Sequence, residues 1–482
     1  MRPLFRPMSN DATVTKNMKV FLSIILFPCL VYILTGKQKT HNIVLFLIDD
    51  LGWKDLGCYG SDYYRTPHID KLAKQGIRFT DAYAACAVCS PTRAAIMTGK
   101  YPARIMLTEW LPSGRWNPKA KLRSGRFLRG LPLEEITLAE ALRKAGYETC
   151  IAGKWHLGSE PFLTPAHHGF GVNIGANEHG NPGNYFFPYK GQWSIPTTKL
   201  KARWQVLAGG KPGEYLTDRL TDEAIAFVRK QRDKPFFLYF SHYAVHTPFQ
   251  AKKDMIKKYE RVPKEKRQGK PVYAAMVESV DESVGRIMAC LKELELDDDT
   301  LVIFTSDNGG FAGATKHAPL RGNKGAYYEG GIRVPLVIRW PGVTKAGQVS
   351  HVPVTSSDLY PTCLTAGGLP LHPAQHRDGL DLKTVLEGAK SLDREALFWH
   401  YPHYNSHPSA VPSSVMRKGD WKLIETFDPK GVELYHLGDD LSETTNLAKK
   451  ESAKLAELRR ELDAWRKEVD AEMMEPNPDH GN

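Results

Sequence analysis

The chain has 482 residues, of which 42% are hydrophobic and 25% charged, a composition typical of a globular protein and unlike that of a disordered or fibrous chain. This length leaves room for two or three domains. The formal net charge of +11 suits contact with polyanions. No aromatic stacking pattern accompanies the basic residues between 104 and 129, so we expect no nucleic-acid partner. Seven scattered cysteines, an odd number, exclude a disulfide framework.

The N-terminus predicts export. Basic residues at positions 2, 6, 16 and 19 precede an apolar run over residues 20–34. As a helix, this run would span about 22 Å, which is less than the roughly 30 Å hydrocarbon core of a membrane. We therefore expect residues 1–36 to be a signal peptide, with a short membrane anchor as the alternative, and the protein to be periplasmic or extracellular. Contact with a membrane is expected only through this segment, if it stays uncleaved.

Buried strands are predicted along the chain, and polar residues follow each of them. The unbroken apolar run over residues 43–48 is typical of a strand in a parallel sheet, and Asp49 and Asp50 follow it. Strands over 147–152, 236–241 and 301–305, each after a helical segment, lead to Lys154 and His156, to His246, and to Asp307 and Asn308. This alternation predicts an α/β fold with a large, doubly wound, mostly parallel sheet and helices on both faces. Since such sheets gather ligands at the carboxyl ends of their strands, we expect these side chains to converge.

The pattern changes after about residue 385. A hairpin and a further strand between residues 414 and 437 predict a small antiparallel sheet. A final helix over about 452–472 carries one apolar stripe, which we expect to pack on that sheet. The chain is therefore expected to divide into a large domain over residues 37–385 and a C-terminal subdomain over residues 386–482.

Four of the side chains that follow strands predict a metal site. They are Asp49, Asp50, Asp307 and Asn308. All four are hard oxygen donors, which suit calcium or magnesium and not a thiophilic metal. Taken one at a time, such residues are more often helix caps or turn formers, but two pairs at two strand ends favour a metal. We expect one ion at this site, and the donors alone leave calcium and magnesium both open.

Cys86 and Cys89 form a C-x-x-C pair between the first two predicted strands. A zinc site would need a second pair of ligands at suitable spacing, and none is evident. A redox pair would not explain Pro91, Arg93 and Gly99, which continue the motif. Neither interpretation accounts for the whole segment.

The segment 89–99 resembles the signature by which sulfatases mark one cysteine for oxidation to formylglycine, with Thr92 and Ile96 as mild departures. The resemblance extends over about residues 42–339 and implies membership of the alkaline phosphatase superfamily. It implies that a formylglycine-generating enzyme oxidises Cys89, and that the product completes a calcium shell with the four oxygen donors. One hydroxyl of the aldehyde hydrate would attack sulfur, and the other, once deprotonated, would expel the sulfate.

The same resemblance implies roles for five basic residues. Arg93 would hold the formylglycine hydroxyls, and Lys154 would steady the sulfate. His156 would be the base of the elimination step, and His246 would contact the leaving oxygen. Lys324 would neutralise sulfate and share in assisting the leaving group. The matching segments are 89–99, 153–158, 246–248 and 319–335.

Two other functions compete with this one. A phosphatase or phosphodiesterase of the same superfamily would have Thr or Ser in place of Cys89 and would bind two metals through additional His and Asp ligands. A secreted glycan-binding protein could have kept the fold and lost activity, but the complete set of polar residues argues against it. We therefore expect a sulfatase whose substrate is a sulfated small molecule or glycan.

The substrate is indicated less directly. The segments around residues 400 and 416–424 are similar to sulfatases of polysaccharide-degrading bacteria, which favours galactose or N-acetylgalactosamine sulfates. A basic loop over 115–129 and a His- and Tyr-rich loop over 400–407 either line the substrate pocket or lie on the surface without touching substrate.

Overall fold

The computed structural model describes residues 40–112, 119–194, 201–407 and 409–480. The described residues belong to one compact unit. The predicted signal peptide or anchor over residues 1–36 lies outside the described residues, and the domain boundary near residue 385 stays a prediction. In the described part of the chain, no helix is both long and apolar enough to cross a membrane.

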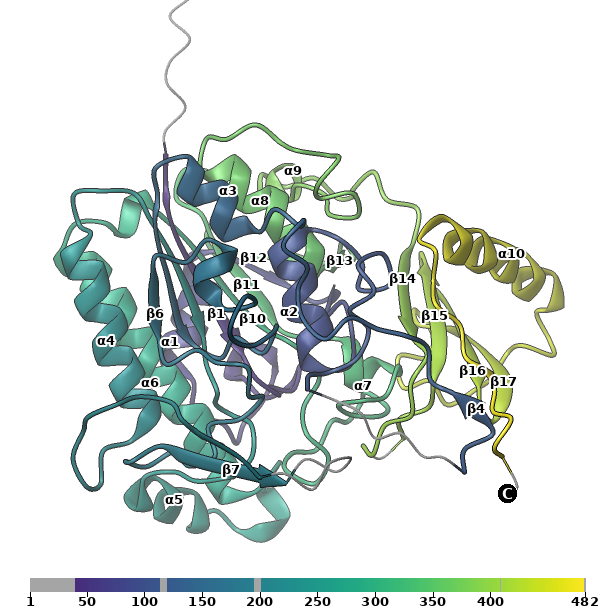
Figure 1. Cartoon of the computed structure of the whole chain (residues 1–482), viewed down its shortest axis with the longest axis horizontal. Coiled ribbons are helices and arrows are strands. Elements are labelled where there is room, and N and C mark those ends of the chain that lie inside the picture. The colour runs from purple at the N-terminus through teal and green to yellow at the C-terminus, as the bar shows by residue number, and fades with distance from the viewer. Residues whose placement is uncertain (1–39, 113–118, 195–200, 408, 481–482) are drawn as a thin grey trace, which may run out of the picture. The chain divides into compact units, whose positions relative to one another are not determined.

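An eight-stranded sheet forms the centre of this unit (Figure 1), in the strand order β12-β2-β11-β10-β1-β9-β5-β6. Its strands are β1 (Asn42–Ile48), β2 (Ile77–Phe79), β5 (Glu148–Gly153), β6 (Val172–Ile174), β9 (Phe236–Ser241), β10 (Thr300–Ser306), β11 (Leu336–Arg339) and β12 (Gln348–Ser350). Of these eight, β11 is the one strand that runs antiparallel to its neighbours. The predicted mostly parallel sheet is thus confirmed. Every residue of β1, β9 and β10 is buried, which explains their unbroken apolar runs.

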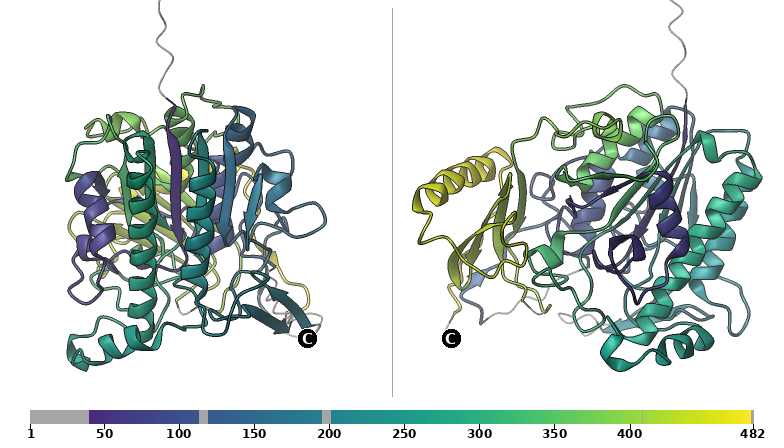
Figure 2. Two further views of the ribbon diagram at one scale, coloured as in Figure 1. Left: turned by 90° about the vertical axis from the view of Figure 1, so that its left-hand side faces the viewer. Right: turned by 180° about the vertical axis from the view of Figure 1, so that it is seen from behind.

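Helices cover both faces of the sheet (Figures 1 and 2), as the doubly wound prediction requires. Successive side chains of β1 point to opposite faces. Val44, Phe46 and Ile48 pack with α1 (Pro67–Gln75), α4 (Leu216–Lys230) and α6 (Pro271–Glu293). Ile43, Leu45 and Leu47 pack with α2 (Cys89–Thr98), α3 (Leu138–Lys144) and α8 (Leu359–Ala366).

The helix α2 carries the cysteine motif and ends at its glycine. Gly99 adopts a left-handed conformation with a φ of 69°, and its N–H donates to the carbonyl of Ala95. A Cβ at this position would lie 2.3 Å from Cβ of His376, so a larger residue is excluded on both grounds. The motif glycine therefore ends the helix that positions Cys89.

The C-terminal part forms the predicted small antiparallel sheet, which has four strands because the first adds to the three that the sequence predicted. They are β14 (Leu397–Tyr401), β15 (Ser413–Lys418), β16 (Trp421–Phe427) and β17 (Lys430–His436). The terminal helix α10 (Ser452–Glu468) lays its apolar stripe on one face, where the rings of Phe398 and Trp465 stack with centroids 4.8 Å apart. The other face packs against Val88, at the start of α2, and against Ile332 of α7 (Glu329–Ile332).

A buried cluster of charges joins this sheet to α7. The ammonium Nζ of Lys422 lies 2.8 Å from Glu329 Oε1 and 2.8 Å from Glu443 Oε1. The other carboxylate oxygen of Glu329 lies 2.6 Å from Nε of Arg333. Burial alone would raise the pKa of Glu329, but the charges of Lys422 and Arg333 hold it below its usual value. The cluster therefore fixes the segment that follows Lys324 to the C-terminal sheet.

Shorter elements complete the fold. The helices are α5 (Lys253–Glu260) and α9 (Lys383–Leu386), with 3-10 turns at Gly57–Tyr59, Pro165–His168, Lys264–Lys266, Asp297–Asp299 and Ser356–Asp358. Three two-stranded pairings join β3 (Ala82–Tyr83) with β13 (Val354–Thr355), β4 (Leu122–Arg123) with β18 (Glu475–Pro476), and β7 (Lys190–Ser194) with β8 (Lys201–Gln205).

Candidate active site

Neighbouring strands end side by side and bring the predicted residues together. The central strand β1 leads directly to Asp49 and Asp50. Its neighbour β10 leads to Asp307 and Asn308, and β5, beyond β9 on the other side, leads to Lys154. All five side chains are buried. The sheet topology, and not proximity in sequence, therefore assembles the site.

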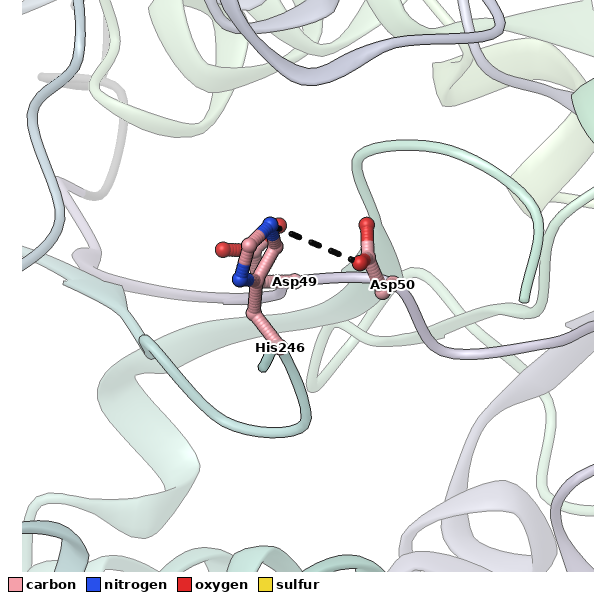
Figure 3. Close-up of side chains that lie close together, drawn as sticks. All are labelled: Asp49, Asp50 and His246. Atoms are coloured by element: carbon pink, nitrogen blue, oxygen red, sulfur yellow. Dashed lines mark ion pairs between the residues drawn. The ribbon is translucent and has the colours of Figure 1, made fainter. Parts of the chain in front are cut away.

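Two ammonium groups pair with the first two carboxylates. Lys154 Nζ lies 2.7 Å from Asp49 Oδ2, and Lys324 Nζ lies 2.5 Å from Asp50 Oδ1. His246 Nε2 lies 3.7 Å from Asp50 Oδ2 (Figure 3). Of the two ammonium groups, that of Lys324 belongs to a residue that borders the same cavity as Cys89, whereas Lys154 is fully buried.

Arg93 on α2 orients Asp307. Its Nε and Nη2 donate to Asp307 Oδ2 at 2.9 and 2.7 Å, and Nη1 donates to the carbonyl oxygen of Lys154 at 3.1 Å. Both members of this ion pair are fully buried. The sequence did not predict this pairing, and a contact of Arg93 with formylglycine hydroxyls stays a prediction.

The oxygen donors fit a hard divalent cation. Among the described residues, Asp49 Oδ1, Asp50 Oδ2 and Asn308 Oδ1 are buried without a hydrogen-bond partner, although buried polar atoms almost always have one. Burial raises the pKa of Asp49 to about 8 against the opposing charge of Lys154, and the nearby carboxylates of Asp307 and Asp50 add to the rise. A cation would satisfy these oxygens and favour the ionised carboxylate. Among the described residues, Asp49, Asp50 and His246 bring possible ligand atoms close enough to hold one metal ion, which makes this a possible acidic metal site. Ligation by Asp307 and Asn308 stays a prediction.

Cys89 is the first residue of α2 and borders a cavity of about 230 Å³. His156, His246 and Lys324 border the same cavity. Burial raises the pKa of the Cys89 thiol, against the opposing charges of Lys154 and Lys324. An unmodified thiol here is therefore poorly ionised and a weak nucleophile.

The neighbouring Cys86 does not form a redox pair with it. Its sulfur lies 3.0 Å from the hydroxyl of Tyr327, and burial raises the pKa of the Cys86 thiol to about 12. Cys86 and Cys89 are both free thiols in the described structure. Reactive dithiol sites require a lowered thiol pKa, so the geometry opposes the redox interpretation.

His156 presents one nitrogen suited to a base. Its Nε2 donates a hydrogen bond to the carbonyl oxygen of Leu111, because a carbonyl can only accept. Its Nδ1 therefore carries the lone pair, and this buried atom has no partner among the described residues. Burial, with the charge of Lys154, lowers the pKa of His156 well below its usual value, so the ring is neutral at neutral pH.

His246 has the opposite tautomer. Its Nδ1 lies 2.8 Å from the carbonyl oxygen of Thr247 and therefore carries the proton, which leaves the lone pair on Nε2. Burial and the charge of Lys324 lower the pKa of His246 to about 3, although Asp50 opposes this shift. Burial would lower the pKa of Lys324 as well, but the Asp50 carboxylate raises it above its usual value. Lys324 is therefore the protonated group of the two.

Comparison with known proteins decides the family. Residues 41–369 match the family model described as Sulfatase, and residues 323–469 match the model described as N-sulphoglucosamine sulphohydrolase, C-terminal. The chain belongs to the sulfatase family. It is an enzyme that hydrolyses sulfate esters, which confirms the predicted class over the phosphatase and glycan-binding alternatives.

Individual relatives show how far the likeness extends. The sulfatase is 32% identical to a sulfatase of Formosa agariphila over 90% of each chain. It is 35% identical to human N-acetylgalactosamine-6-sulfatase over 76% of this chain and 69% of that protein. The solved structure of Ps i-CgsB in complex with k-i-k-neocarrahexaose is 31% identical, with a TM-score of 0.74 over 88% of this chain and 92% of that one. The phosphonate monoester hydrolase of Agrobacterium radiobacter, 22% identical with a TM-score of 0.63, shares the fold alone.

The two loops considered as pocket walls of the sulfatase differ in whether their described residues border the cavity. Ser406 and His407 of the 400–407 loop border the cavity, whereas His400 and His403 are buried against other parts of the protein. No described residue of the basic 115–129 loop borders the cavity. Three arginines of that loop contact other protein groups instead: Arg123 with Asp479, Arg126 with Glu472 and Arg129 with the carbonyl of Pro112.

Sequence reasoning missed the aromatic wall of the sulfatase cavity. Trp193 and Trp204, on the paired strands β7 and β8, border it together with His179 and Phe311. The alternation of polar residues with Gly, Ala or Trp along both strands could have revealed this hairpin from the sequence. No sequence signal indicates that the hairpin lies over the active site.

Proposed function

We propose that this sulfatase removes sulfate from a glycan, with calcium as its metal and formylglycine at position 89 as its nucleophile. One observation carries the proposal. Cys89 and Lys324 border the same cavity. Lys324 also forms an ion pair with Asp50, which belongs to the acidic metal site with its unpartnered buried oxygens. This combines charge neutralisation, a position for a nucleophile and a proton donor, which together meet the requirements of sulfate-ester cleavage.

Calcium would be held by oxygens of the four predicted residues. They are Asp49, Asp50, Asp307 and Asn308, of which Asp49 and Asp50 belong to the group of possible ligands and Asn308 has an unpartnered buried oxygen. Bound there, the ion would offset the negative charge of the sulfate group. Arg93 keeps the carboxylate of Asp307 in one orientation through two hydrogen bonds, and Tyr273 donates to the backbone carbonyl of Asp50 at 3.2 Å. These residues position the oxygen donors.

Formylglycine would be made from Cys89 by a separate maturation enzyme. When hydrated, it would supply one hydroxyl for attack on sulfur and a second whose deprotonation releases the sulfate. The high thiol pKa in the folded protein supports the need for this change, since the thiol itself is a poor nucleophile.

The chain's own side chains would move the protons. Lys324 is the protonated group of the Lys324–His246 pair and can donate to the leaving oxygen, while the Nε2 lone pair of His246 can hold a hydroxyl of the substrate in place. Lys154 steadies the sulfate by its charge. The unpartnered Nδ1 of His156 can accept the proton in the later elimination step.

Two relatives support a carbohydrate substrate. Human N-acetylgalactosamine-6-sulfatase is named for a sulfated sugar, and the Ps i-CgsB structure holds k-i-k-neocarrahexaose. Both exceed 30% identity with this chain. They favour the galactose or N-acetylgalactosamine sulfates expected from the sequence, and export through residues 1–36 would bring the enzyme to such substrates outside the cell.

The direct test is sulfate release from a panel of defined sulfated mono- and disaccharides. Protein co-expressed with a formylglycine-generating enzyme should release sulfate from at least one galactose or N-acetylgalactosamine sulfate, and elemental analysis should find one calcium per chain. Removal of calcium by a chelator should abolish release, and added calcium should restore it. Two zinc ions per chain, with hydrolysis of phosphate esters in place of sulfate esters, would overturn the proposal.

Substitutions of the two histidines should separate their roles. His246→Ala should lower kcat/KM for a sugar sulfate by about 2- to 10-fold, and less for an activated aryl sulfate, which has no hydroxyl for the Nε2 lone pair to hold. His156→Ala should instead accumulate a sulfated residue at position 89 with both substrates, detectable by peptide mass spectrometry. His242 serves as control, because it stacks on Phe240 with centroids 4.0 Å apart and does not border the cavity. Equal losses on both substrates for His246→Ala, or no adduct in His156→Ala, would show that the roles are wrongly assigned.

A further inference from the structure

The hairpin of β7 and β8 presents one face to the active-site cavity. Along both strands, exposed residues alternate with less exposed ones. Gly191 and Trp193 of β7 pair with Trp204 and Ala202 of β8, so these four lie on one face of the hairpin. Both tryptophans of this face border the cavity next to Cys89, whereas Gln192, which precedes Trp193 on β7, is exposed.

Trp204 is held in place by its neighbours. Its ring lies against the backbone of Gly191, where a Cβ would come within 2.2 Å of Trp204 Cε2. The ring of His179 stacks on it, with centroids 3.9 Å apart and an interplanar angle of 20°. Glycine at 191 is therefore required by the close approach of the indole, and Trp204 forms a rigid base for the wall.

Trp193 differs from Trp204 in its surroundings. It is partly exposed, borders the cavity, and stacks on no other ring of the described residues. An indole in this position presents apolar surface to whatever enters the cavity. Because Trp193 forms an aromatic wall with Trp204 and His179 beside Cys89, and its own ring is not stacked on another ring of the described residues, the indole face points to a ligand.

The other walls of the cavity are mixed, with Trp110, Leu111 and Phe311 as apolar members and several polar side chains beside them. Asn181, Thr247, Ser406 and His407 border it and offer hydrogen-bonding groups. An entirely apolar substrate, such as a sterol, would leave these groups unpaired and desolvated. A pyranose has both features that such a cavity requires, because it carries an apolar face of C–H groups and a rim of hydroxyls. The volume of about 230 Å³ is below the 300–1,000 Å³ typical of sites for drug-sized ligands, and so suits one sugar ring.

We propose that Trp193 stacks on the pyranose ring that bears the sulfate and is a specificity-determining residue of this enzyme. The inference rests on the proposed glycan sulfatase function and adds to it the residue that distinguishes a sugar from other alcohols. The sulfate lies towards Lys324 and Cys89, and the ring that carries it lies along the hairpin wall.

The test compares two substrates with an alkoxide leaving group, of which one contains a sugar ring and the other does not. Trp193→Ala should lower kcat/KM roughly 5- to 100-fold for the best sulfated monosaccharide of the panel, mainly through KM, because stacking on an aromatic ring contributes about that much binding. Activity on an acyclic alkyl sulfate should change less than about twofold, and Trp193→Phe should restore most of the loss. Gln192→Ala is the matched control, since its side chain lies on the other face of the same strand.

A second measurement does not depend on turnover. In calcium-loaded Cys89→Ala protein, titration calorimetry with the same sulfated monosaccharide should give a Kd that rises roughly 5- to 100-fold on adding Trp193→Ala. An unchanged Kd and kcat/KM, or an equal loss on the acyclic sulfate, would overturn the role of Trp193 and leave the sulfatase function intact. If the unsubstituted enzyme releases sulfate from no sugar, the proposed glycan sulfatase function is refuted, and the role of Trp193 is refuted with it.

Discussion

Cys89→Ala is expected to lower kcat/KM for every sulfate ester by at least about four orders of magnitude, because it removes the nucleophile and not a binding contact. The side chain lies at the first residue of α2 and borders the cavity that holds His156, His246 and Lys324. Removing one sulfur atom at a helix end should leave the fold intact. Sulfate release with the best sugar sulfate, alongside the midpoint of thermal unfolding, measures both effects.

Cys86 provides the matched control for this experiment. It lies three residues away, is equally buried, and contacts the Tyr327 hydroxyl without bordering the cavity. Cys86→Ser should therefore keep most of the activity. Peptide mass spectrometry of the unsubstituted protein should show the aldehyde at position 89 and an unmodified thiol at position 86. A fully active Cys89→Ala variant would refute the assignment of the nucleophile.

Lys422→Met is expected to lower the free energy of unfolding by about 3–5 kcal/mol, because it removes one partner from a fully buried ion pair. Two carboxylates, of Glu329 and Glu443, would remain inside the protein without their shared ammonium. Burial already raises the pKa of Glu443 to about 7 against the charge of Lys422, so the carboxyl should take up a proton in the variant. Urea unfolding followed by circular dichroism measures the loss.

Lys418→Met tests whether the effect comes from burial. Lys418 lies at the end of β15 in the same sheet, and its Nζ lies 2.7 Å from Glu461 Oε1 in a partly exposed pair. Such surface pairs contribute at most about 1 kcal/mol. A loss of this small size in Lys422→Met as well would mean that the buried cluster contributes little to folding.

The strands and the oxygen donors could be predicted because their signals are local. An apolar run such as 43–48 indicates a buried strand, and the rule that parallel strands end at one edge brings Asp49 and Asp307 together without further information. The resemblance to sulfatases added Cys89 and Lys324, which lie in recognisable segments. Both kinds of signal need only a few neighbouring residues.

The remaining features depend on contacts between distant residues. Arg93 and Asp307 are 214 positions apart, and nothing local to either indicates that the arginine's donors are taken by the carboxylate. The hairpin carrying Trp193 has a recognisable alternation, but its place over the cavity depends on the fold of the whole unit. Protonation states such as those of His156 follow from burial and from carbonyl partners, which also require coordinates.

The contribution of Ser406 and His407 to the cavity bears on when activity can begin during synthesis. Cys89 is synthesised early, whereas Ser406 and His407 lie in the last fifth of the chain. The sheet that packs on Val88 also lies late in the chain, at residues 397–436. A ribosome-bound chain that stops before this point has its metal ligands and Cys89 but neither the finished cavity nor the Lys422 cluster. A product truncated before residue 397 would therefore lack two wall residues of the cavity and the sheet that supports α2, and we expect it to have lost most of its sulfatase activity.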